Sequence, residues 1–306
     1  MNDGTGTSST VLALFKRRQP KVTEQAKEPI VITILVEDSV SVPVLKAEHG
    51  LAFWIDTGAR RILFDAGQSR LILDSAKELK LDLDAVDTIA LSHGHYDHCG
   101  GLADVLANAA SAVTVYAHPR ALDPKYRHAA TGTREIGMSI QCRQALCKGR
   151  HNLKKITTPT EIAPGMFLTG EIPRSHPEEQ GESVFCLDAQ GTQADPFLDD
   201  QALFFGTPAG IIVILGCAHA GVINTLDYIR HLAGDQPLHT VLGGMHLHSA
   251  SDERIAWTIK SLRQFSVERF YPMHCTGAKA LAALWTAFPR RCFPCGVGAT
   301  INSKYK

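Results

Sequence analysis

Residues 91–101 read LSHGHYDHCGG and constrain this chain more than any other stretch of it. Three histidines and an aspartate, His93, His95, Asp97 and His98, fall within six positions. Imidazole nitrogens and carboxylate oxygens are ligands that borderline divalent metals such as zinc prefer. In an extended backbone, side chains two residues apart point to the same side, so His93, His95 and Asp97 are expected to converge. His98 then points elsewhere, which suits a second metal ion near the first.

The cluster follows an apolar run, and this arrangement recurs along the chain. Later single histidines also come directly after predicted strands: His219, His246 and His274. Ligands at the carboxyl ends of strands are typical of sites in α/β proteins. We therefore expect these loops to meet at one edge of the fold.

Hydrophobic patterning predicts alternating strands and helices. The expected strands are Ile30–Val36, Leu51–Ile55, Arg61–Phe64, Val86–Leu91, Ala112–Ala117, Met166–Thr169, Ser183–Leu187, Ala202–Phe205, Gly210–Leu215, Thr240–Leu242 and Phe270–Pro272. The expected helices are Leu71–Leu81, Leu102–Ala110, Ile223–Leu232, Ser251–Phe265 (capped by Ser251 or Asp252) and Ala278–Ala287. This order indicates two α/β halves that face one another.

Three regions differ in character. Residues 1–27 are polar and rich in Ser, Thr and Gly, so we expect a flexible N-terminal tail without a signal peptide. Residues 28–306 are expected to form a single domain. Within it, residues 118–158 lack periodicity and carry many cations, which predicts a long insertion near the site. Its Arg134 is a candidate contact for an anionic substrate.

Composition narrows the function classes. The formal net charge is zero, with 31 basic and 31 acidic residues, so we expect no nucleic-acid partner. No apolar run reaches the roughly 20 residues of a membrane span, so we expect no membrane partner. Eight scattered cysteines fit reduced thiols in a cytoplasmic protein. The expected partner is a small-molecule substrate, and a homodimer is left open.

The His-x-His-x-Asp-His signature, the Asp65-Ala66-Gly67 strand end and the later histidines resemble the metallo-β-lactamase superfamily. The segments TGEIPR (169–174), DDQAL (199–203), GCAHAGVINT (216–225), GGMHL (243–247) and HCTG (274–277) resemble one branch of it. That branch is named for an archaeal dihydropterin–ribofuranosylaminobenzene phosphate synthase. The resemblance implies an α/β fold, a four-layer αβ/βα sandwich of the metallo-β-lactamase type.

The resemblance also implies two divalent metal ions, with zinc expected and manganese or iron as alternatives. Its ligand sets would be His93, His95 and His219 for one ion, and Asp97, His98 and His274 for the other. The superfamily often has an aspartate bridging the ions after a Gly, but here Gly216 is followed by Cys217. Cys217, Glu171 or Asp200 is a candidate bridge, or no protein bridge exists.

The resulting hypothesis is a metal-dependent hydrolase in which a metal-activated hydroxide attacks a small anionic substrate of phosphoester type. Asp97 is the candidate catalytic residue that accepts a proton. His246, Glu171 and Arg134 are candidate substrate-binding residues. The alternatives are a pterin-pathway synthase or transferase, and a non-catalytic ligand sensor on the same fold.

Overall fold

The computed structural model describes residues 29–234 and 236–303. The expected tail at residues 1–27 lies outside them. Among the described helices, none has the length and apolar character to cross a bilayer.

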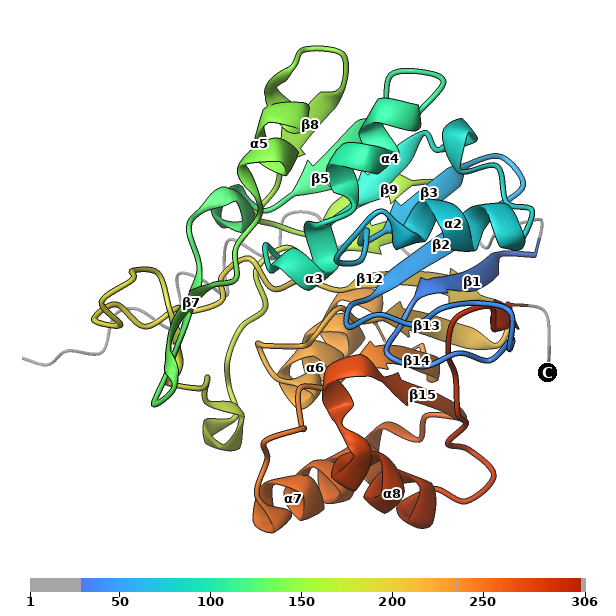
Figure 1. Ribbon diagram of the computed structural model, residues 1–306. Coiled ribbons are helices and arrows are strands. Elements are labelled where there is room, and N and C mark those ends of the chain that lie inside the picture. The colour runs from blue at the N-terminus through green and yellow to red at the C-terminus, as the bar shows by residue number, and fades with distance from the viewer. Residues whose placement is uncertain (1–28, 235, 304–306) are drawn as a thin grey trace, which may run out of the picture.

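The first sheet has seven strands in the order β16-β1-β2-β3-β4-β5-β8 (Figure 1). They are β1 (Val31–Val36), β2 (Ala52–Asp56), β3 (Arg61–Phe64), β4 (Thr88–Ala90), β5 (Thr114–Ala117), β8 (Asn152–Lys155) and β16 (Thr300–Asn302). Strands β1, β2 and β3 form an antiparallel meander, and β3, β4, β5 and β8 run parallel. The last described strand, β16, pairs with the first, which ties the two ends of the domain together.

The second sheet repeats this plan with six strands in the order β15-β14-β13-β12-β10-β9. They are β9 (Thr160–Ala163), β10 (Met166–Leu168), β12 (Leu203–Thr207), β13 (Gly210–Ile214), β14 (Leu238–Gly244) and β15 (Arg269–Met273). Strands β9, β10, β12 and β13 are antiparallel, whereas β13, β14 and β15 are parallel. Each half therefore ends in parallel strands whose carboxyl ends lie at one edge.

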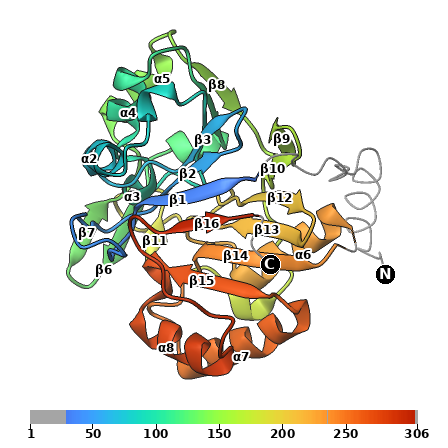
Figure 2. The same cartoon turned by 90° about the vertical axis from the view of Figure 1, so that its right-hand side faces the viewer.

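The helices cover the outer faces of the two sheets. Helices α2 (Leu71–Glu78), α4 (Leu102–Asn108) and α5 (Ile140–Cys147) lie on the first sheet, and α6 (Val222–Ala233), α7 (Asp252–Leu262) and α8 (Ala278–Ala287) lie on the second (Figure 2). The side chain of Ser251 caps α7 by accepting a hydrogen bond from the backbone N–H of Arg254 at 3.2 Å.

The alternation of buried side chains explains the layers. In β3, Ile62 and Phe64 join the core between the sheets, whereas Leu63 packs under the helices of the first sheet. In β13, Ile212 and Ile214 face the other sheet, and Val213 packs toward α6. Since both faces of each sheet are covered, the strands read as continuous apolar runs. The expected four-layer αβ/βα sandwich is confirmed.

The expected non-periodic insertion at residues 118–158 is wrong in detail, because the segment has regular structure. It contains a hairpin of β6 (Tyr126–Ala129) and β7 (Gly132–Glu135), then α5, then β8 of the first sheet. Short strands with exposed residues carry little hydrophobic periodicity, which hid them. The strand expected at Ser183–Leu187 is shorter in the structure: only β11 (Phe185–Cys186) forms, and it pairs with β6 in a separate three-stranded sheet.

Candidate metal centre

The predicted ligands meet at the edge where the parallel strands of both sheets end. His93 follows β4, His219 follows β13 and His274 follows β15. All three side chains are buried; His93 and His219 lie in loops, and His274 begins a short 3-10 helix. Loops from different strands thus converge, as the sequence predicts.

The expected extended backbone through Asp97 is wrong. A short helix, α3, spans Tyr96–Cys99, with His95 extended at its N-terminal boundary. Asp97 therefore does not share a side with His93 and His95. The turn of helix places its carboxylate with His98 instead.

The first group is formed by three imidazoles from two loops, and we call it the imidazole triad: His93, His95 and His219. One ring nitrogen from each lies within 4.8 Å of the others. The Nε2 atoms of all three are buried and have no hydrogen-bond partner in the described chain. Three orphaned nitrogens that converge fit a divalent ion with imidazole ligands.

The second group, which we call the acidic triad, is formed by Asp97, His98 and His274. The Asp97 carboxylate lies 3.4 Å from Nε2 of His274 and 3.8 Å from Nε2 of His98. The two imidazole Nε2 atoms are 3.3 Å apart. This triad spans both halves of the sandwich, since His274 comes from the second sheet.

Carboxylates behind the acidic triad fix the tautomers of its histidines. Nδ1 of His98 donates to Asp65 at 2.7 Å, and Nδ1 of His274 donates to Asp38 at 2.8 Å. Each neutral Nε2 therefore presents a lone pair, and two lone pairs facing each other repel unless a proton or a metal cation lies between them. The residues present fit a metal ion on this ground.

The pKa values of the histidines differ between the two triads. Burial lowers the pKa of His93 and His219 well below the usual value, and neighbouring histidines lower it further; burial also lowers the pKa of His95 to about 3, against the opposing charge of Asp97. Burial acts in the same direction on His274, but hydrogen bonds to Asp38 and Asp97 outweigh it and raise its pKa well above the usual value.

Some supporting residues were not predicted as part of the site. Asp38 joins His274 to His49, whose Nε2 lies 3.2 Å from the Asp97 carboxylate. On the other side, Asp199 accepts from the backbone N–H of Gly94 at 2.9 Å. The position of Asp38 shortly after β1, at the ligand edge, was the one sequence signal for its role. Its contact with His274 could not be predicted from local pattern, because 236 positions separate the two residues.

Lys125 is a buried cation inside the segment expected to be a long insertion. Its ammonium contacts Asp195 at 2.7 Å and Asp199 at 2.9 Å. The arrangement anchors Asp199, which in turn holds the Gly94 backbone between His93 and His95. Burial favours the neutral amine, but the two carboxylates outweigh it and raise the pKa of Lys125. The ammonium therefore stays ionised.

The backbone at the site departs from ordinary conformations. Four non-glycine residues at the ligand edge have positive φ: Asp65 (60°), Ala218 (56°), His246 (47°) and His274 (51°). Left-handed backbone of this kind costs free energy and is concentrated at functional sites. The surrounding fold therefore holds these residues in a strained backbone conformation at the site.

A cavity of about 660 Å³ opens above both triads. His95, Asp97, His219 and His274 lie on its floor, and the β6–β7 hairpin forms an opposite wall. Arg134 of that hairpin lines the cavity and stacks over the Tyr96 ring at 4.8 Å. The predicted substrate contact is therefore placed within reach of the site.

The remaining candidates fall in different places. His246 lines the cavity, with its ring 4.2 Å from that of His219. Glu171 is instead paired with His118 at 3.0 Å and does not line this cavity. Neither Glu171 nor Asp200 belongs to a described cluster of converging ligand atoms, whereas Cys217 does.

Comparison with known proteins identifies the same superfamily as the sequence motifs. The sequence profile of the Beta-lactamase superfamily domain matches residues 60–178. An uncharacterized protein of Methanocaldococcus jannaschii is 36% identical over 255 residues, which cover 83% of this chain and 93% of that protein.

A second relative and one solved structure have names that state a function. The 7,8-dihydropterin-6-methyl-4-(β-D-ribofuranosyl)-aminobenzene-5′-phosphate synthase of Methanocaldococcus jannaschii is 30% identical over 249 residues, covering 76% of this chain and 83% of the synthase. The crystal structure of Tm1679, described as a metal-dependent hydrolase of the β-lactamase superfamily, has a TM-score of 0.76 and 32% identity, covering 89% of this chain and 98% of Tm1679. This chain belongs to the metallo-β-lactamase superfamily, in the branch that resembles the archaeal synthase.

Proposed function

We propose that this protein is a metal-dependent hydrolase that acts on a small anionic substrate of the phosphoester type. The observation that carries the proposal is the meeting of two ligand triads on the floor of one cavity. Two divalent ions held there, zinc first and manganese or iron as alternatives, would supply Lewis acidity and lower the pKa of a water.

The charge of the cavity wall favours an anion. Arg127 and Arg134 are directly opposite each other in the β6–β7 hairpin, so both side chains lie on the same face. Among the described residues neither arginine forms an ion pair, and like charges placed opposite each other destabilise a hairpin. A bound phosphate or carboxylate group would remove this repulsion.

Two aromatic rings bound the cavity beside the charged groups. Phe185 of β11 lies across from Arg127 and contacts the rings of His95 and His246. Tyr96 lies beneath Arg134. This combination fits a substrate with an apolar body and an anionic group.

Asp97 is the residue assigned to take up the proton that an attacking water gives up. Its carboxylate is on the cavity floor and contacts His49 at 3.2 Å. The His49 side chain is 52% exposed, so it connects the buried carboxylate to solvent. His246 lies on the cavity wall next to His219 and is assigned to contact the substrate.

A synthase or transferase of the pterin pathway is the second candidate, and the 30% identity to the archaeal synthase favours it. The same cavity and arginines would then bind a substrate that carries a phosphate group. For either function we place the protein in the cytoplasm, with a small molecule rather than nucleic acid or a membrane as its partner.

A panel assay tests the proposal. Protein loaded with zinc or manganese is offered phosphodiesters, phosphomonoesters, lactones, a β-lactam, and ribofuranosylaminobenzene phosphate together with a dihydropterin whose 6-methyl group carries a diphosphate leaving group. Phosphoester turnover supports the hydrolase, and condensation of the last pair supports the synthase. Full metal content without turnover of any compound would contradict both and favour a ligand sensor.

A further inference from the structure

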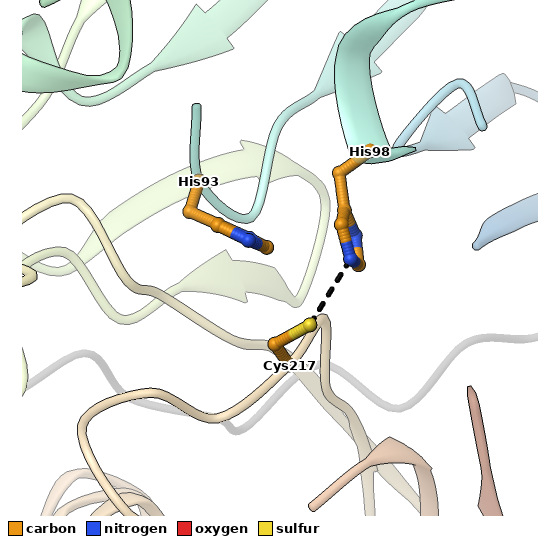
Figure 3. Close-up of side chains that lie close together, drawn as sticks. All are labelled: His93, His98 and Cys217. Carbon is orange, nitrogen blue, oxygen red and sulfur yellow. Dashed lines mark hydrogen bonds between the residues drawn. The ribbon is translucent and has the colours of Figure 1, made fainter. Parts of the chain in front are cut away.

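Cys217 occupies the position between the two triads. Its Sγ lies 3.1 Å from Nε2 of His98 (Figure 3). Ligand atoms of His93, His98 and Cys217 all lie within 4.8 Å of one another. One of those histidines belongs to the imidazole triad and the other to the acidic triad, so the sulfur faces both.

Both histidines have an Nε2 atom without a proton near this position, and that of His98 contacts the sulfur. Nδ1 of His93 lies 2.9 Å from the Ser92 hydroxyl, which itself donates to Asp65 at 2.6 Å, so this nitrogen is the donor. Nδ1 of His98 is likewise committed to Asp65. The two Nε2 atoms are therefore acceptors. Cys217, which is 3% exposed, adds a third electron-pair donor to the same buried space.

The fold brings the sulfur there by close backbone packing. A Cβ at Gly216 would collide with the Ser92 side chain, and one at Gly244 would meet the Cys275 Sγ at 2.5 Å. These two glycines let the loop after β13 press against both the His93 loop and β14. The position of Cys217 is thus set by the framework rather than by a mobile side chain.

The other candidate bridges do not reach the space between the triads. Asp200 accepts from the backbone N–H of Ala220 through Oδ2 at 2.8 Å and keeps a buried Oδ1 without a hydrogen-bond partner among the described residues, and Glu171 pairs with His118. Neither contributes an atom to a described ligand cluster.

We propose that the Cys217 thiolate is a ligand shared by the two metal ions, in the place between the triads. The inference rests on the proposed metal centre and specifies its chemistry. Binding of the first ion forms an S–metal bond and releases the thiol proton to solvent, without any change of oxidation state. A shared thiolate selects zinc, cobalt or cadmium over magnesium and calcium, because soft ligands favour softer ions.

Cobalt spectroscopy tests this without reference to turnover. Chelated protein, kept reduced and free of oxygen, is titrated with Co²⁺ while bound cobalt and the near-ultraviolet sulfur-to-cobalt charge-transfer band are both measured. The band is expected to grow with the bound metal in the unaltered protein and to be lost in Cys217→Ser. In Cys217→Asp the band is expected to be lost while cobalt still binds, since a carboxylate can also be shared.

Two cysteine variants serve as comparisons. Cys142 is as buried as Cys217 but donates to the backbone carbonyl of Cys99, so Cys142→Ser is expected to keep the full band. Cys275 contributes to a neighbouring cluster with Cys217 and His246. A band that persists in Cys217→Ser, or that is lost only in Cys275→Ser, would overturn the assignment.

X-ray absorption of the unaltered zinc-loaded protein provides a measurement that needs no variant. A sulfur scatterer at about 2.3 Å from zinc is expected. Bound zinc with only nitrogen and oxygen neighbours would refute the thiolate ligand while leaving the metal centre intact. Failure to bind any metal would instead defeat the proposed function itself.

Discussion

The imidazole triad and the acidic triad lie side by side, yet the protein surrounds them differently. No carboxylate oxygen of the described residues lies within ion-pairing distance of the rings of His93, His95 or His219, whereas Asp65, Asp38 and Asp97 all contact the histidines of the acidic triad. One triad consists of neutral imidazoles, because burial opposes their protonation to the charged form. The other is a negatively charged network that retains a proton until a cation replaces it.

This difference teaches that three ligands do not define a metal site by themselves. The groups behind the ligands determine their charge, their tautomers and their competition with protons. We therefore expect the two positions to respond differently to mutation and to pH.

The largest expected effect comes from removing one ligand of each triad in turn. His95→Ala is expected to empty the imidazole triad and His274→Ala the acidic triad, so that metal content falls by about half in each while the fold is kept. His95→Ala is also expected to abolish most activity. Elemental analysis and circular dichroism check this.

His248→Ala is the matched control, because His248 lines the cavity but belongs to no described ligand cluster. It should retain its full metal content. An unchanged metal content in His95→Ala would break the ligand assignment.

The second prediction concerns Asp38, which supports only the acidic triad. Asp38→Asn keeps the size of the side chain but removes the charge that orients His274, so affinity there should fall about 10–100-fold. A competition titration with a chelator, in the His95→Ala background, isolates that position. Asp56→Asn, at a surface pair with Arg61, is the control and should not change affinity.

The third prediction is a difference in pH dependence. In the metal-free protein the raised pKa of His274 means that a proton must leave when a metal binds, so affinity at the acidic triad should rise by about tenfold per pH unit below that pKa. The lowered pKa values of the imidazole triad, about 3 for His95, mean that its rings are already neutral and release no proton when a metal binds.

Metal titrations of His95→Ala and His274→Ala between about pH 6 and pH 8 measure the two dependences separately. Because the Cys217 thiol loses its proton to the metal in both variants, each affinity should rise with pH, and the rise in the first variant should be steeper by the one further proton that leaves His274. Equal slopes would show that the carboxylates behind His274 do not govern its protonation.

The smallest expected effect lies on the cavity wall. Arg134 stacks on Tyr96, next to the acidic triad, and Arg134→Ala should raise KM for an anionic substrate about three- to tenfold while kcat changes less. Arg120→Ala, which removes an exposed arginine outside the cavity, should leave KM unchanged. An unaltered KM in Arg134→Ala would remove its substrate role.

Much of the fold was predictable because it depends on local pattern. Runs such as Gly210–Ile214 are apolar along their whole length, which identifies a strand buried on both faces. The β6–β7 hairpin and β8 were missed because their residues are largely exposed and show no such pattern. Secondary structure stabilised by tertiary contacts leaves a weak local signal.

By itself, the sequence determined the types of ligand, their placement after strands and the superfamily, because these follow from residue chemistry and short-range periodicity. The tertiary structure decided between two expectations for Asp97: the spacing placed it beside His93, the resemblance placed it with His98 and His274, and it lies with the latter pair, since α3 begins at Tyr96. It also placed Cys217 between the triads and Asp38 behind His274. These contacts join loops more than a hundred residues apart, and only the packing of the two sheets brings such loops together.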